Sequence, residues 1–209
     1  MANDRVLLVE AEGSMGGTTQ AALEESKVAF DTSAGHKHTG ADSTVIDSAG
    51  AASEGIVELA TAAETTTGTD AARAVTPDGL AGSDYGKRPM LIKLIDDATA
   101  LAIGDGKFIF VVPAILNGWN LVGVEAHVTT VSSSGLPTYS IYNLTDSVDM
   151  LSTSITIDAN EYTSATAATP PVINGATDDV ATGDRIEINK DVAGTGEKGD
   201  EVLLIFQLP

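Results

Sequence analysis

The chain has 209 residues, of which 43% are apolar, and a formal net charge of −19. This length allows one domain with a tail or two small domains, and the negative charge argues against binding to nucleic acid or to an anionic membrane. There are no cysteines, so neither a disulfide framework nor a thiolate metal site exists. The first predicted element is a strand over residues 6–9, which is too short for an export signal or a membrane span, so we expect the protein to be assembled in a cytoplasm.

The chain divides into three predicted parts, namely an N-terminal arm over residues 1–34, a slender middle part over residues 35–88 and a β-rich domain over residues 89–209. In the first two parts the apolar residues come in short bursts between runs of Gly, Ser, Thr and Ala. A short helix over residues 18–28 is expected within the arm. A single chain could not form a dense core in these parts, so we expect neighbouring copies to supply the missing apolar surface.

Two of the three histidines, His36 and His38, lie one residue apart in a glycine-rich segment. On an extended strand, residues i and i+2 point to the same face, so both imidazoles can be directed at one point. Three copies meeting on an axis would supply six imidazoles, a ligand set that suits iron, nickel or zinc. The alternative is a solvated turn with no ligand. The metal hypothesis predicts a trimer.

The segment that follows combines a strand with helical turns. Residues 54–61 alternate as a strand does, and we expect three apolar side chains of this strand to be buried: Ile56, Val57 and Leu59. A first helical turn is expected over residues 69–73. Thr76 and Pro77 predict a second, short helix, because a hydroxyl before a proline is typical of a helix start.

From about residue 90 onward, turn residues separate short apolar segments at regular intervals. The expected strands cover residues 91–95, 107–112, 120–130, 138–144, 153–158, 184–189 and 201–208, with shorter pieces near Met150 and Val172. Strands this numerous, without long helices between them, favour an antiparallel β-sandwich of jelly-roll type. In the strand over residues 120–130 the expected core positions are Val122, Val124, Ala126 and Val128.

No residue of the chain forms a recognisable catalytic motif, so we expect a non-enzymatic protein. Trp119 is expected to be a core lid or an interface anchor, and alternatively a binding residue that stacks on a sugar ring. His127 falls on the polar face of its strand and is assigned no chemistry. Acidic residues cluster in loops at residues 96–97, 146–149 and 178–184; turn or cap roles are the commoner use of such loops, with calcium binding and glycoside hydrolysis as alternatives.

Two stretches resemble fibre and appendage proteins of tailed bacteriophages. Residues 30–43 resemble the Gly-His-x-His-x-Gly element of phage fibres, although Thr39 stands where that element often has aspartate. Residues 55–64, 68–70 and 73–80 are similar to the short repeat of tail-fibre shafts and necks, with its strand, glycine turn and Thr-Pro helix in the same order. Together the two stretches cover roughly a quarter of the chain.

The resemblance implies a structural protein of the virion, in the form of an intertwined homotrimeric tail or baseplate fibre. It implies that residues 1–34 attach to other virion proteins, that residues 35–88 form a shaft or neck, and that residues 89–209 form an outward knob that adsorbs to a host surface glycan. In this family, histidine pairs such as His36 and His38 hold a metal on the trimer axis. A head fibre or capsid decoration (cement) protein remains an alternative, as does a carbohydrate-binding module or glycan-degrading enzyme. No nucleic-acid binding or membrane insertion is expected.

Overall fold

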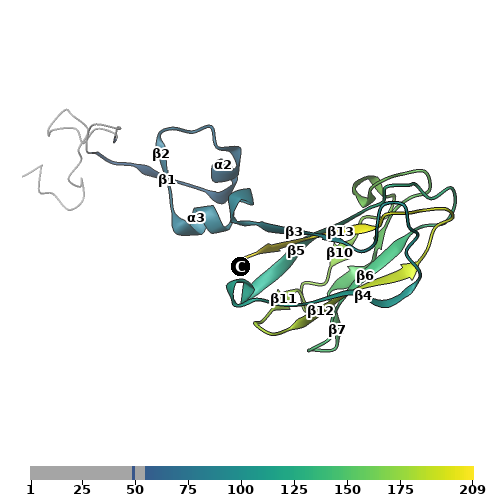
Figure 1. Ribbon diagram of the computed structural model, residues 1–209. Coiled ribbons are helices and arrows are strands. Elements are labelled where there is room, and N and C mark those ends of the chain that lie inside the picture. The colour runs from purple at the N-terminus through teal and green to yellow at the C-terminus, as the bar shows by residue number, and fades with distance from the viewer. Residues whose placement is uncertain (1–48, 50–54) are drawn as a thin grey trace, which may run out of the picture. The chain divides into compact units, whose positions relative to one another are not determined.

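Antiparallel β-structure dominates the computed structural model, which describes residue 49 and residues 55–209 (Figure 1). The described residues form antiparallel sheets, one of them a half-barrel, and two short helices. Residues Leu59–Pro209 make one compact unit. The predicted arm over residues 1–34, its helix over residues 18–28 and the pair His36 and His38 lie outside the described residues.

The first described elements form a small β–α–β–α arrangement that we call the α2–α3 segment (residues 58–86). Its elements are β1 (Glu58–Ala60), α2 (Ala62–Thr67), β2 (Arg73–Val75), α3 (Pro77–Ala81) and the 3-10 turn η1 (Asp84–Gly86). Strands β1 and β2 pair with each other and with no other described strand. None of the helices in the described part of the chain is long and apolar enough to cross a membrane.

Helix α2 is fixed by a capping box at its start. The Thr61 hydroxyl accepts a hydrogen bond from the backbone N–H of Glu64 at 3.3 Å, and the Glu64 carboxylate accepts one from the Thr61 N–H at 3.0 Å. Two orphan donors of the first turn are thereby satisfied. Gly68 ends the helix in the left-handed conformation, with φ of 65°.

The two helix predictions for this segment differ in outcome. The predicted Thr76–Pro77 helix is confirmed as α3, and the Thr76 hydroxyl accepts a hydrogen bond from the Gly79 N–H at 3.0 Å. The helical turn predicted over residues 69–73 is wrong. Asp70 Oδ1 instead accepts a hydrogen bond from the Ala72 N–H at 2.7 Å, which bends the chain into strand β2.

The burial predicted for the strand over residues 54–61 is also wrong. Its three large apolar side chains are exposed in the chain: Ile56, Val57 and Leu59. The alternating pattern does form strand β1, but among the described strands β1 pairs only with the short β2, and helix α3 packs against it at the buried Ala60 rather than at the three large side chains. Alternation therefore identified the strand without identifying what packs on it.

The remainder of the unit contains two larger antiparallel sheets. The four-stranded sheet has the order β11 (Asp179–Val180), β5 (Trp119–His127), β13 (Glu201–Gln207) and β3 (Arg88–Lys93). The five-stranded sheet has the order β4 (Gly104–Val111), β12 (Arg185–Val192), β6 (Thr138–Asn143) and β7 (Val148–Asp149), with β9 (Ile155–Thr156) also paired to β6. A separate two-stranded pair is formed by β8 (Leu151–Thr153) and β10 (Val172–Ile173). Two further 3-10 turns are η2 (Ala114–Leu116) and η3 (Ser164–Thr166).

Each strand predicted beyond residue 90 has a counterpart, with one region divided in two. The segment expected as one strand over residues 153–158 becomes the end of β8 and then β9. Strand β11 was not predicted. Both larger sheets contribute to one buried hydrophobic cluster, which includes Ile92, Leu121, Val124, Val202, Leu204 and Phe206 from the first and Tyr139, Ile141, Ile186 and Ile188 from the second.

The core face predicted for β5 is confirmed at three positions and wrong at one. The confirmed positions are Val124, Ala126 and Val128. Val122 is instead 41% exposed, whereas Leu121 is fully buried. The reason is a β-bulge: Ile205 of β13 pairs with Gly123, and the next residue, Phe206, pairs with Leu121. Val122 is therefore the extra residue, and the faces exchange at this point.

Candidate functional site

The α2–α3 segment has almost no core of its own. Its buried residues are small or polar: Ala60, Thr65, Gly79 and Ser83. Its larger apolar side chains are exposed instead, with Leu59 at 59% and Val75 at 52%, together with Leu80 and Tyr85. Exposed apolar side chains on a segment with so little core of its own are typical of a surface that another chain covers.

A second apolar surface lies along the edge strands of the two larger sheets. Strand β3 ends the four-stranded sheet and β4 ends the five-stranded sheet. A groove of about 490 Å³ is lined by residues of both strands and by Pro113: Met90, Leu91, Ile92, Lys93, Phe108, Phe110 and Val111. Leu91 and Val111 are 61% and 60% exposed. Edge strands with exposed apolar side chains are sites at which another chain can pair or pack.

Trp119 lies where the α2–α3 segment joins the sheets. It is half-buried and packs against the core, and the Arg88 guanidinium carbon is 5.6 Å from the centroid of its ring. A cavity of about 260 Å³ adjoins it, lined also by α3, η1 and Leu208. Gln207 Nε2 donates hydrogen bonds to the carbonyl oxygens of Ala81 and Ser83, at 2.8 and 3.0 Å, which ties α3 to β13. This placement fits the predicted role of Trp119 as a packing residue. Its alternative role, stacking on a sugar ring, stays a prediction.

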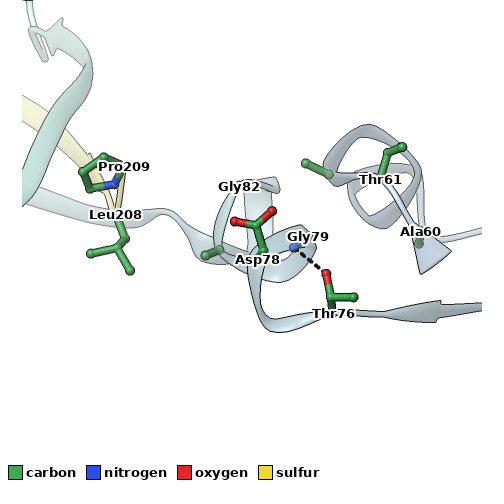
Figure 2. A pocket seen from close by; sticks show the side chains of 10 residues that line it. Ala60, Thr61, Thr76, Asp78, Gly79, Gly82, Leu208 and Pro209 are labelled. Atoms are coloured by element: carbon green, nitrogen blue, oxygen red, sulfur yellow. Dashed lines mark hydrogen bonds between the residues drawn. The ribbon is translucent and has the colours of Figure 1, made fainter.

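A smaller cavity of about 180 Å³ lies at the start of α3 (Figure 2). Figure 2 shows Asp78 and the Thr76 cap on α3 between the Ala60–Thr61 turn on one side and Leu208 and Pro209 on the other. Its walls come mostly from backbone and small side chains, and Asp78 is its one charged residue. We assign it no binding role.

A cluster of charged side chains is buried inside the unit. Lys190 of β12 is 0% exposed, and its Nζ lies 2.6 Å from Glu197 Oε1 and in contact with Asp200 Oδ1. The Tyr139 hydroxyl of β6 donates to the same Asp200 oxygen and lies 3.1 Å from Nζ. The ammonium group is also 4.6 Å from the centroid of the Tyr139 ring. Asp200 and Glu197 are buried as well.

Several oxygens of this cluster lack hydrogen-bond partners among the described residues. Asp200 Oδ2 and Glu197 Oε2 have none, and Glu197 Oε1 has only its ionic contact with the Lys190 ammonium group. Gly194 makes room for Glu197, since a side chain at position 194 would collide with Ser132 and lie 2.8 Å from Glu197 Oε2. Burial raises the pKa of Tyr139 above its usual range, and the Asp200 carboxylate raises it further, so the hydroxyl stays protonated as a donor.

The buried cluster was not predicted from the sequence, although a signal for it exists. Lys190 follows Ile186 and Ile188 at intervals of two, so the period of a strand places it on the core-facing side of β12. Asp200 precedes Val202 and Leu204 at the same interval in β13. A lysine and an aspartate in phase with core residues are each expected to be buried, and a buried charge needs a partner of opposite sign.

The acidic loops have structural roles. Asp97 pairs with Lys93 at 2.6 Å, Asp184 Oδ2 accepts a hydrogen bond from the Ala181 N–H at 2.8 Å, and Asp146 accepts one from Asn143 at 2.9 Å. No group of three or more potential metal ligands occurs within the described residues. Calcium binding therefore gains no support there, and the predicted metal ligands His36 and His38 lie outside that part of the chain.

His127 lies on the partly exposed face of β5, as predicted. Its Nε2 is 3.7 Å from Glu125 Oε2, and both side chains are about two-fifths exposed. No hydroxyl or thiol nucleophile is hydrogen-bonded to it in the described structure, so the geometry gives it no catalytic role.

Comparison with known proteins identifies no relative of this chain. No protein-family model, no curated protein and no solved structure matches it significantly.

Proposed function

We propose that this protein is a non-enzymatic structural protein of a tailed-bacteriophage virion, a homotrimeric tail or baseplate fibre. The N-terminal arm attaches it to other virion proteins, the α2–α3 segment belongs to its neck, and the β-rich part is an outward knob that adsorbs to the host surface. The order of elements supports the neck assignment, because β1, the Gly68 turn and the Thr76-capped α3 follow the order of the fibre repeat that the sequence resembles.

One observation carries the proposal: the α2–α3 segment folds with its large apolar side chains exposed and only small or polar residues buried. An ordered segment of this kind needs apolar area from outside to offset the entropy of ordering its backbone. Two identical partners would supply that area around a threefold axis, with Leu59 and Val75 facing the partners. The groove between β3 and β4 offers the knob a second contact of the same kind.

The sheets support the finer assignment of the knob. Two antiparallel sheets that contribute side chains to one core are the arrangement of a jelly-roll-like β-sandwich. In such a trimer the edges formed by β3 and β4 are covered by neighbouring copies, which would account for the exposed Leu91 and Val111.

The mass of the full chain in solution, measured by light scattering at several dilutions, tests the proposal. We expect three times the chain mass of 21.3 kDa. Leu59→Asp places a charge in the proposed neck interface and should shift the mass toward that of one chain. Leu136→Asp is the matched control, because Leu136 is also exposed but lies in a loop of the sheet region, and this variant should remain a trimer. A wild-type monomer at all dilutions would overturn the proposal.

The axial metal is tested separately. If His36 and His38 of three chains bind iron, nickel or zinc, metal analysis of the purified trimer should find one ion per three chains. The His36→Ala, His38→Ala double variant should contain none, whereas a His127→Ala variant should keep the full content. Unchanged metal in the double variant would exclude the histidine site without affecting the fibre assignment.

A further inference from the structure

We propose that Lys190 and Asp200 become joined by an amide bond between their side chains, with Glu197 as the catalytic proton acceptor. Lys190 Nζ contacts Asp200 Oδ1 and is therefore next to the carbon it would attack, the carboxyl Cγ. Glu197 Oε1 lies 2.6 Å from the same nitrogen. The nucleophile, the electrophile and the base are thus held together within one buried cluster.

An ordinary buried ion pair explains the cluster poorly. Burying charges costs several kcal/mol per ion unless the remaining lone pairs are hydrogen-bonded. Here one ammonium group faces two carboxyl groups, and two of the four carboxyl oxygens, Glu197 Oε2 and Asp200 Oδ2, have neither a hydrogen-bond partner nor an ionic contact among the described residues. Conversion of the Lys190–Asp200 pair to a neutral amide removes two of these charges from the core, which relieves the cost of burying that pair.

The reaction balances without any co-reactant. The Lys190 ammonium group loses a proton to Glu197, and the neutral nitrogen attacks Cγ of Asp200. A C–N bond forms, the bond from Cγ to Oδ2 breaks, and Oδ2 leaves as water. Of the three ammonium protons, one stays on the amide nitrogen and two leave in the water molecule, passed on by Glu197. No electrons are exchanged with another species.

The other members of the cluster suit this chemistry. The protonated Tyr139 hydroxyl donates to Asp200 Oδ1, which is where negative charge develops during attack on Cγ. Among the described residues, Asp200 Oδ2 has no hydrogen-bond partner that would retain it as it leaves. Because the reacting side chains are buried, bulk water is kept from the amide, and hydrolysis is disfavoured.

The bond would tie the two sheets together. Lys190 belongs to β12 in the five-stranded sheet, and Asp200 immediately precedes β13 in the four-stranded sheet. The chain has no cysteine, so no disulfide bond within the chain can join the two sheets. The inference does not depend on the proposed virion function, because it concerns residues within one chain.

Intact mass spectrometry of the denatured full chain is the deciding measurement. We expect a mass lower by one water molecule than the mass calculated from the sequence. Tryptic digestion should leave Lys190 uncleaved and yield residues 186–198 joined through Lys190 to Asp200 of residues 199–209. A folded wild-type protein of full calculated mass, with Lys190 cleaved by trypsin, would overturn the proposal and leave a plain ion pair.

Variants assign the roles. Glu197→Gln keeps the size of the side chain but removes the proton acceptor, so the folded variant should show the full calculated mass. Lys198→Met is the matched control, because Lys198 is an exposed lysine of the same loop, and this variant should keep the mass deficit. A mass deficit that persists in folded Glu197→Gln would remove Glu197 from the mechanism. The wild-type measurement stands even if this variant does not fold.

Discussion

At the scale of single residues, Gly199 fixes the approach of the chain to the buried cluster. Its φ is +71°, and a Cβ there would collide with the Thr129 hydroxyl and lie 2.9 Å from Asp97 Cα. Gly199→Ala should therefore lower the free energy of unfolding by about 2 to 4 kcal/mol, from backbone strain and overpacking together. Gly175→Ala is the matched control, because no atom lies within 4 Å of the added Cβ and its φ is not positive. Urea denaturation compares them, and equal stabilities would contradict the expected collision.

Tyr139 predicts a dependence of stability on alkaline pH. Because its pKa is raised in the folded protein, the unfolded chain loses this proton first as the pH rises. The contribution to stability is fully present below pH of about 10 and declines above it, by about 1.4 kcal/mol per pH unit. Tyr139→Phe should lack this part of the decline. Urea denaturation of both proteins between pH 9 and 11.5 measures it, and parallel curves would show that Tyr139 ionises equally in both states.

At the scale of elements, local signals in the sequence predicted structure better than they predicted burial. Thr76 and Pro77 predicted α3 correctly, because a cap and its proline act within one helical turn. The capping box of Thr61 and Glu64 was present in the sequence but was missed, so α2 was not predicted. The burial of Leu59 was mispredicted because strand alternation does not reveal which surface covers a strand, or whether that surface belongs to the same chain.

The bulge in β5 gives a test at the same scale. Val122 and Val124 both fit the pattern of a core face, but the bulge leaves Val122 41% exposed and Val124 7% exposed. Val122→Thr should change the free energy of unfolding by less than about 0.5 kcal/mol. Val124→Thr should lower it by about 1 to 3 kcal/mol, because a hydroxyl without a partner is buried. Thermal or urea unfolding measures both, and a larger loss from Val122→Thr would place the register shift elsewhere.

At the scale of the whole molecule, what the sequence could predict differs between the two candidate sites. The lack of a dense core in the α2–α3 segment follows from composition, because short apolar bursts between small polar residues cannot close a core. The Lys190–Asp200 contact needs tertiary information. Strand period places each residue on a core face, but the pairing of β12 with one sheet and β13 with the other brings them together.

The net charge makes the proposed trimer sensitive to salt. Each chain carries −19, so assembly brings three strongly negative surfaces together and is opposed by their repulsion. Salt screens such repulsion, since the Debye length falls from about 30 Å at 0.01 M to about 8 Å at 0.15 M. We therefore expect the urea midpoint for trimer dissociation to rise as NaCl increases over this range.

The control for this prediction replaces NaCl with sucrose at equal osmolality, which leaves the repulsion unscreened and should give a smaller rise. The range is kept below 0.15 M because higher salt also strengthens apolar association, which would obscure the electrostatic effect. A midpoint that falls with NaCl would mean that ion pairs of opposite sign hold the chains together. The lysines and arginines, 11 per chain, would then have to lie at the interface, and the apolar surfaces around Leu59 and Leu91 would not be the main contacts.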